Sequence, residues 1–249
     1  MRKYVAILVG ILFLCACHPK SIGGKQISQK SKNYYKGWFG YYYSPGNNTF
    51  ELGFHPLEVD ASSFEVLGKE HAKDKNFVFY QYSPLKANPA TFVSLSDEFG
   101  KDAQHVFYEE HLLEGADAPS FGVNSTGIPY DKEHVFVYDE NIKNYRPSKL
   151  KIDPQTAERL FRGEYESDFL RDKKGIYSLD YVLPVDRDTF HYYGNAIEVG
   201  EKTFLGSWWI DKDHLYLVEW DPDTKADKVK PVKFNKPYKA VDFLRNVKL

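Results

Sequence analysis

A short motif that recurs five times constrains the fold of this chain more than any other feature. Each copy begins with aspartate and runs through a few polar residues into an aliphatic–aromatic pair. The leading residues are Asp74, Asp102, Asp131, Asp172 and Asp211. Recurrence at intervals of tens of residues indicates tandem supersecondary units that bury a continuous core by stacking. We therefore expect a repeat protein.

A second motif, with the form Asx-x-x-Ser/Thr-Phe, falls between the copies of the first. Its copies begin at Asp60, Asn88, Asp117, Asp153 and Asp186. In the fourth copy Ala157 replaces the phenylalanine, and Pro154 follows the leading residue. An Asx residue is typical of a helix N-cap, and proline suits the first helical position. The motif predicts one short helical turn per repeat, with its aromatic ring in the core.

Alternation within the first motif predicts how its strands are buried. The fourth residue after each aspartate is aliphatic and the fifth is aromatic, as in Val78 and Phe79. Adjacent strand residues face opposite sides, so both faces of each sheet should be covered. Aspartate followed by lysine before a strand is typical of a turn, and we interpret the five aspartates as hairpin-turn residues, not as catalytic groups.

These patterns predict an all-β fold with short helical turns, in which tandem β-hairpins form a meandering sheet or a solenoid-like or propeller-like array. The later copies are spaced more widely. There the sequence predicts a helix around Pro154–Arg162 and an extra hairpin around Tyr181–Tyr193. The composition, with 19 Tyr and 18 Phe against one Met, favours strands.

The run Lys73–Tyr80 and its copies resemble the repeats of the DKNYY family of bacterial envelope proteins. The resemblance extends over roughly Asp60 to Val218. It implies an all-β repeat domain, and it implies no particular reaction.

Residues 1–16 have the features of an export signal. Arg2 and Lys3 precede an apolar run, Tyr4–Leu14, that is shorter than the roughly 20 residues needed to span a bilayer. The next residues resemble the lipobox of bacterial lipoproteins, which implies cleavage before Cys17 and lipidation of that cysteine. His18 stands where aspartate would retain a lipoprotein at the inner membrane, so the resemblance implies an outer-membrane lipoprotein that faces the periplasm.

Residues 17–33 are polar, and we expect them to form a flexible tether ahead of a repeat-built β domain over residues 34–249. An alternative is a basic segment that lies on anionic headgroups, because it holds Lys20, Lys25, Lys30 and Lys32. The formal net charge of the whole chain is −2, which gives no basic footprint of the kind that a nucleic-acid-binding protein shows.

Three histidines, His105, His134 and His214, share the position three residues after the leading aspartate. Equivalent positions one repeat apart do not meet unless the repeats close around an axis. No second ligand pair at zinc-like spacing follows His105 and His111. We predict neither a metal site nor a cofactor.

For the other candidate sites, a structural role explains the residues more simply than a chemical one. The segment Asp221–Asp227 has Lys225 where a calcium loop needs an oxygen ligand, and we interpret it as a hairpin tip. The acids Glu164, Glu166 and Asp168 could serve glycosidic hydrolysis, but a solvated strand face explains their alternation more simply. The sequence has no nucleophile elbow, phosphate loop or dinucleotide fingerprint.

The pair Trp208–Trp209 is the candidate for partner binding. Adjacent strand residues face opposite ways, so either the sheet is covered on both sides and both indoles are core, or one indole is a platform for a partner or a sugar.

The leading functional hypothesis is a non-enzymatic, lipid-anchored envelope protein that binds another macromolecule, either an envelope protein or a glycan. An immunity-like or inhibitor-like role is one form of it. The alternatives are an envelope hydrolase that uses carboxylates of the C-terminal half, and a structural surface component. The sequence does not specify an oligomeric state.

Overall fold

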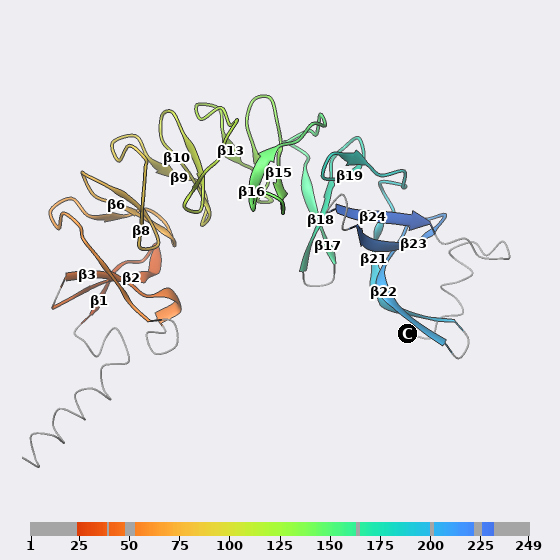
Figure 1. Ribbon diagram of the computed structural model, residues 1–249, viewed down its shortest axis with the longest axis horizontal. Coiled ribbons are helices and arrows are strands. Elements are labelled where there is room, and N and C mark those ends of the chain that lie inside the picture. The colour runs from red at the N-terminus through yellow and green to blue at the C-terminus, as the bar shows by residue number, and fades with distance from the viewer. Residues whose placement is uncertain are drawn as a thin grey trace, which may run out of the picture. The chain divides into compact units, whose positions relative to one another are not determined.

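The computed structural model describes residues 24–38, 40–47, 53–162, 165–199, 202–221 and 226–231. These residues form short antiparallel strands and one short 3-10 helix, η1 (Pro45–Asn47), so the predicted all-β fold is confirmed (Figure 1). The chain divides into two compact units, Met1–Phe121 and Gly122–Leu249. Within the described segments, no helix is both long and apolar enough to cross a bilayer.

The first unit contains three modules, each a meander of four antiparallel strands. Module 1 consists of β1 (Lys25–Ser28), β2 (Ser31–Gly37), β3 (Gly40–Tyr43) and β4 (His55–Leu57). Module 2 consists of β5 (Glu65–Val66), β6 (His71–Lys73), β7 (Val78–Tyr80) and β8 (Ser83–Leu85). Module 3 consists of β9 (Val93–Ser94), β10 (Phe99–Lys101), β11 (Val106–Tyr108) and β12 (His111–Leu112).

The second unit continues the same plan. Module 4 consists of β13 (Gly122–Val123), β14 (Pro129–Tyr130), β15 (Phe136–Asp139) and β16 (Asn144–Pro147), and a bridge between Tyr130 and Val135 connects its two strand pairs. Module 5 consists of β17 (Glu158–Arg162), β18 (Tyr165–Arg171), β19 (Ile176–Ser178) and β20 (Tyr181–Val182). Module 6 consists of β21 (His191–Val199), β22 (Lys202–Ile210), β23 (Leu215–Asp221) and β24 (Ala226–Pro231).

The aspartate motif forms the turn between the second and third strands of modules 2 to 6. In module 2, for example, Asp74 follows β6 and precedes β7, and the second motif, which ends at Phe64, lies directly before β5. The sequence predicted two strands per repeat, whereas the structure has four. The outer strands contain as few as two residues, too few to show any alternation.

Module 1 corrects the predicted tether. Residues 17–33 were expected to be flexible, but β1 and the start of β2 occupy the part from Lys25 onward. Polar side chains stabilise this hairpin locally, since the Gln26 amide donates to the carbonyls of Ser28 and Ser31. Its second turn uses Gly40, at a φ of 119°, in place of the aspartate motif, so the sequence search missed this module.

Two elements predicted in the wider spacings are also wrong. The expected helix around Pro154–Arg162 is a single turn, closed by the Ala157 N–H to the Asp153 carbonyl, followed by β17. The expected hairpin around Tyr181–Tyr193 is instead the end of module 5 and the start of module 6, because β20 pairs back to β19 and β21 pairs forward to β22.

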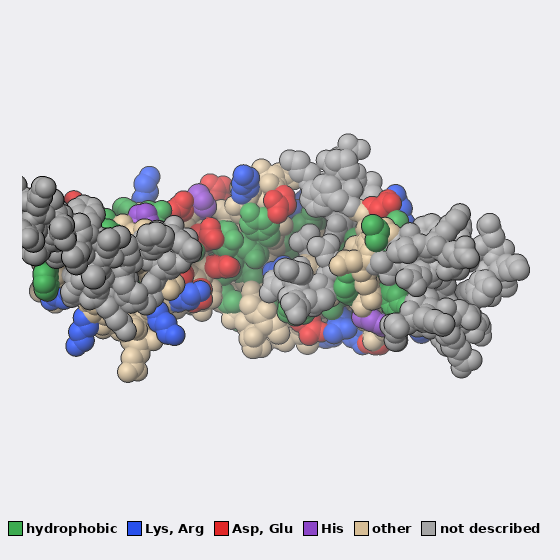
Figure 2. Space-filling model, turned by 90° about the horizontal axis from the view of Figure 1, so that it is seen from below, with side chains coloured by type: hydrophobic (Ala, Val, Ile, Leu, Met, Phe, Trp, Pro, Cys, Tyr) green, Lys and Arg blue, Asp and Glu red, His purple; other side chains and the backbone are tan. Residues whose placement is uncertain are grey.

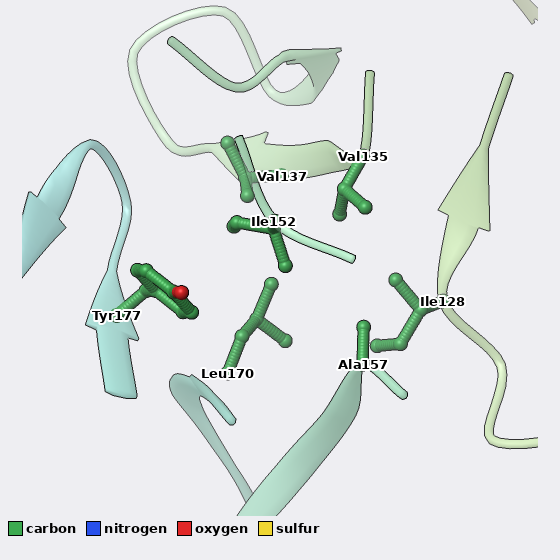
Figure 3. Close-up of a cluster of buried hydrophobic side chains, with 7 residues drawn as sticks. All are labelled: Ile128, Val135, Val137, Ile152, Ala157, Leu170 and Tyr177. Carbon is green, nitrogen blue, oxygen red and sulfur yellow. The ribbon is translucent and has the colours of Figure 1, made fainter. Parts of the chain in front are cut away.

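The modules stack through unlike faces. The aliphatic residue of one motif packs in the same cluster as the aromatic residue of the next, as Val135 does with Tyr177 (Figure 3). The same pairing joins Val78 with Phe107 and Ile176 with Tyr216. Among the ten residues at these two positions, Tyr177 is the most exposed, at 5 %. Coverage of both sheet faces is therefore confirmed.

The second motif supplies a further aromatic ring to these interfaces. Phe92, Phe121 and Phe190 are buried, whereas Phe64 is half-buried. Phe190 stacks on Trp209 with ring centroids 5.1 Å apart. The predicted place of this aromatic residue in the core is confirmed at the three buried positions.

Candidate functional site

The repeat aspartates are buried acceptors of hydrogen bonds, and Asp172 shows the arrangement in full. Its Oδ1 accepts from the backbone N–H of Lys174 (2.7 Å) and Gly175 (3.0 Å), and from the Tyr177 hydroxyl (2.8 Å). Its Oδ2 accepts from the backbone N–H of Asp153 (2.8 Å). The carboxylate thus fixes its own turn with one oxygen and holds the second motif with the other.

The same contact, which we name the Asp–Asx junction, joins the two motifs in other modules. It pairs Asp74 with the Asp60 N–H, Asp102 with the Asn88 N–H, and Asp211 with the Asp186 N–H. A second bond closes each junction: the residue after the aspartate donates its backbone N–H to a Ser or Thr hydroxyl of the second motif, as Lys75 does to Ser63 (3.0 Å). The two sequence motifs are therefore one structural device.

The lysine that follows most of these aspartates is explained by the same junction. Lys75 pairs with Asp60 at 2.8 Å, and Lys212 pairs with Asp186 at 2.8 Å. In module 3, Ala103 replaces the lysine, and there the partner position is Asn88, which carries no charge to pair. These ion pairs are exposed to solvent, so each contributes little to the stability of the fold.

Burial alone would raise the pKa of Asp172, but the hydrogen bonds from Asp153, Lys174 and Tyr177 together lower it below its usual value. The pKa values of Asp102 and Asp211 are lowered for the same reasons. These carboxylates are ionised and held by backbone donors. The structure places all five aspartates in turns, as expected. They are at most 6 % exposed, so these turn residues are also buried.

The tryptophan pair is buried, which corrects its interpretation as a partner-binding platform. Trp208 is 5 % exposed and Trp209 is 1 % exposed. Trp209 packs against Phe169 and Phe190, and its indole N–H donates to the Ser207 hydroxyl. The alternative, that both indoles belong to the core, is the one the structure supports, because both faces of module 6 are covered at these positions.

The motif histidines remain in their separate turns. The Nδ1 atom lies 3.4 Å from the carboxylate of the leading aspartate in His105, and 3.7 Å from it in His134 and in His214. In the part of the chain that the structure describes, no three His, Cys, Asp or Glu side chains gather as metal ligands would.

Acidic residues of the second unit are held by arginine. Arg146 lies between Asp139 (2.7 Å) and Asp180 (2.9 Å), and although burial would raise the pKa of both carboxyls, Arg146 and neighbouring donors lower it. Glu164 and the side chains of Glu166 and Asp168 lie outside the described residues.

The hairpin predicted for Asp221–Asp227 is confirmed by the pairing of β23 with β24, in which Asp221 lies opposite Ala226. Residues 222–225 at its tip lie outside the described segments, as does Cys17.

His71 breaks the repeat three residues before the leading aspartate. The equivalent residues, Phe99, Ile128, Phe169 and Trp208, are all apolar and buried. His71 is fully buried against Phe92, and its Nδ1 lies 3.0 Å from the Ser94 hydroxyl. Its Nε2 has no hydrogen-bond partner. Burial lowers the pKa of His71 to about 4, although the Ser96 carbonyl and the Asp97 charge act in the opposite direction.

We expect His71→Phe to remove part of the acid sensitivity of the first unit. The folded-state pKa lies below the ordinary 6.5, so the unfolded chain binds the proton first. The stabilisation that depends on neutral His71 is complete above pH 6.5. About 3 kcal/mol of it is lost as the pH falls toward 4. Urea unfolding of both proteins between pH 7 and pH 4 measures the difference, and an equal loss in both would contradict it.

An open groove of about 540 Å³, lined mainly by polar and charged residues, lies where module 1 meets module 2. Its buried lining includes Ser31, Asn33 and Glu70, and its exposed lining includes Lys30, Lys32 and Lys69. This volume lies within the range of about 300–1,000 Å³ that is typical of ligand sites. The groove is the candidate functional site.

Glu70 organises the groove through contacts from module 1. Its carboxylate accepts from the Tyr43 hydroxyl (2.5 Å) and from the Asn33 amide (3.1 Å), while its backbone carbonyl accepts from the Tyr34 hydroxyl (2.6 Å). Burial, together with the neighbouring Glu70, raises the pKa of Tyr43, which keeps the hydroxyl protonated as a donor. The base of the groove is thus preorganised before any partner binds.

The groove also carries an excess of lysine. Lys69 contacts Glu70 at 3.6 Å and Asp97 at 3.4 Å, whereas Lys30 and Lys32 extend into solvent from the β1–β2 turn and from β2. On the face of the molecule that Figure 2 shows, by contrast, acidic and basic side chains are interspersed. The one signal for this site in the sequence was His71, which departs from the apolar residue at the same position of the other repeats.

Comparison with known proteins finds a likeness to one family and to no specific activity. The model of the DKNYY family matches residues 19–140, which include modules 1 to 3 and the groove. This family is not a known enzyme family. No curated protein and no solved structure matches the chain. The match over residues 19–140, in agreement with the repeated Asp-Lys motif that it contains, supports the assignment of this chain to the DKNYY repeat family.

Proposed function

We propose that this chain is a non-enzymatic, lipid-anchored protein of the bacterial envelope that binds an acidic segment of another envelope protein in the groove between modules 1 and 2. The observation that carries the proposal is the groove itself, with a preorganised polar base at Glu70 and exposed lysines at its edge. The anchor is Cys17, and the outer membrane with periplasmic exposure is the proposed location.

The use of the repeat motif supports a binding role over a catalytic one. Its carboxylates accept hydrogen bonds from backbone N–H groups, so in the modules described they fix the turns and join the two motifs. A general base needs an oxygen that is free to take a proton from a substrate. Module stacking instead makes a rigid support, on which the first groove presents its side chains to a partner.

The chemistry of the partner follows from the charges of the groove. Lys30 and Lys32 attract a carboxylate-bearing segment and speed its encounter. At the buried end, Asn33 and Glu70 hold a fixed set of hydrogen bonds that a partner must match or leave intact. An acidic segment with a polar side chain that reaches the groove meets both conditions.

Crosslinking from the groove tests this proposal. A photoreactive residue at Gln29 should capture one envelope protein in intact cells, and the added change Lys32→Glu should reduce the capture by about ten-fold, because it places like charges in contact. The matched control is Lys86→Glu, which changes an exposed lysine that follows β8 and does not line the groove, and it should leave the capture unchanged. Equal yields from the two variants would contradict the proposed site.

A further inference from the structure

The turn between β2 and β3 presents an exposed tryptophan. Trp38 is 83 % exposed, and Phe54, also on module 1, is 50 % exposed. Together with Tyr42 and Pro56 they line a small apolar pocket of about 110 Å³. Tyr42 forms its base, since it is buried, stacks on Tyr35 and contacts the Phe54 ring at 5.8 Å. An exposed indole supported by buried aromatic rings is a rigid apolar projection.

Two lysines flank this projection. In the β1–β2 pairing Lys25 lies opposite Lys36, next to the Gly37–Gly40 turn that carries Trp38. Both lysines are exposed, and the Lys36 ammonium lies 5.3 Å from the centre of the Tyr41 ring. No Asp or Glu occurs among residues 1–50, although the whole chain is slightly acidic. The Trp38 end of module 1 is therefore both basic and aromatic.

The chain also enters module 1 at this end. Because β1 begins at Lys25, opposite Lys36, the segment that leads back to Cys17 starts beside the Trp38 turn. From Cys17 to Gly24 the backbone can span at most about 25 Å when fully extended. A lipid on Cys17 would thus hold the Trp38 turn within a short distance of the bilayer.

We infer that the Trp38 end of module 1, formed by Lys25, Lys36, Trp38 and Phe54, docks on the surface of a bilayer that contains anionic lipids. This inference rests on the lipid anchor of the proposed function. Tryptophan is favoured at the boundary between headgroups and acyl chains, and lysine is attracted by anionic headgroups. The docked face is distinct from the Glu70 groove, whose lysines Lys30 and Lys32 lie toward the opposite end of the β1–β2 hairpin.

Vesicle binding by an unlipidated chain, residues 18–249, tests the inference without the anchor. The chain should sediment with vesicles of phosphatidylcholine and phosphatidylglycerol, and it should bind pure phosphatidylcholine much more weakly. The double change Lys25→Gln/Lys36→Gln should lower the partition coefficient by about 25-fold, because each lysine near such a surface contributes about five-fold. Trp38→Ala should lower it by about ten-fold, since an exposed large apolar side chain no longer leaves water.

Matched controls are available away from this end. Lys86→Gln/Lys151→Gln removes two exposed lysines, and Phe161→Ala removes a ring that is 55 % exposed on module 5. Neither should change vesicle binding. In a Trp220→Phe background, brominated acyl chains should quench part of the tryptophan emission, and the added change Trp38→Phe should abolish this part, because Trp208 and Trp209 are buried. Circular dichroism confirms that each variant is folded.

Two results overturn the inference: no binding of the unchanged protein to anionic vesicles at low salt, or equal losses in the module 1 variants and in the controls. Palmitate labelling of the full chain distinguishes a failure of the docking face from a failure of the lipid anchor, since Cys17→Ser should abolish the label. Label on Cys17 without vesicle binding refutes the docking face alone. Vesicle binding without label on Cys17 refutes the anchor and leaves a face that recruits the chain to membranes by itself.

Discussion

Replacing Asp172 with alanine is expected to destabilise the second compact unit by about 3–5 kcal/mol, because it removes a buried acceptor and leaves its donors unpaired. Those donors are the backbone N–H groups of Asp153, Lys174 and Gly175 and the hydroxyl of Tyr177. The loss should affect the contact between modules as well as the turn, since the Asp153 N–H belongs to the motif that precedes β17. Urea unfolding followed by circular dichroism measures the change.

The matched control is Asp213→Ala, which removes an exposed carboxylate from the equivalent turn region of module 6 and should change stability by less than about 0.5 kcal/mol. The pH gives a second check. The folded-state pKa of Asp172 is lowered, so its stabilisation is present above the unfolded pKa of about 3.9 and is lost as the pH falls below it. Asp172→Ala should lack this loss. Similar free energies for the two alanine variants would show that the junction does not stabilise the array.

Phe190→Ala is expected to cost about 3–5 kcal/mol, because a buried aromatic ring is removed and its neighbours cannot close the cavity. Phe190 is 1 % exposed and packs between Phe169 (5.9 Å), Trp209 (5.1 Å) and Tyr216 (5.7 Å). These are rigid rings fixed on two modules. The midpoint of urea unfolding should fall accordingly.

Two positions control for this change. Phe161→Ala truncates an exposed ring in module 5 and should have little effect. At the position equivalent to Phe190, the preceding module interface has Ala157, which is 2 % exposed and packs against Ile152 and Leu170. Aliphatic neighbours fill the space there. Ala157→Phe should therefore also destabilise the protein, by overpacking. If neither Phe190→Ala nor Ala157→Phe lowered the stability, the packing at these two interfaces would not depend on which residue fills the position.

The repeat and its buried strand faces could be predicted because they depend on local alternation. A valine followed by phenylalanine after a turn aspartate specifies which residue faces which side, and Val78 and Phe79 lie as expected. The outer strands could not be predicted, since β5 and β13 contain two residues each and show no period. Module 1 was missed because Gly37 and Gly40 form its turn without aspartate.

The burial of the aspartates depends on a partner from another motif, so a motif read singly does not reveal it. The sequence did contain one sign of the contact. Directly after the leading aspartate, four of the five repeats have lysine and one has Ala103. In that same repeat the second motif begins with the uncharged Asn88. Comparison of these two positions across the repeats would have indicated an ion pair between the lysine and the Asx position, and with it the Asp–Asx junction.

The Glu70 groove depends on side chains that are far apart in sequence. Asn33 and Tyr43 reach Glu70 from a module whose existence the sequence did not reveal. No spacing rule connects these residues. The part that could be recognised is the exception at His71, because this histidine stands where other repeats bury phenylalanine, isoleucine or tryptophan.

Stacking through unlike faces gives the array a direction. At three interfaces an aliphatic motif residue of one module packs with an aromatic motif residue of the next, in the same order along the chain. Tandem duplication of such a module therefore creates a module-to-module contact of a kind that is already present. Loss of a module brings its two neighbours together through the same kind of contact. Genes that encode such chains can lengthen or shorten by whole modules without a new core. An exchange that falls between a fourth strand and the following Asx residue keeps each sheet and its Asp–Asx junction intact, whereas one within a sheet does not.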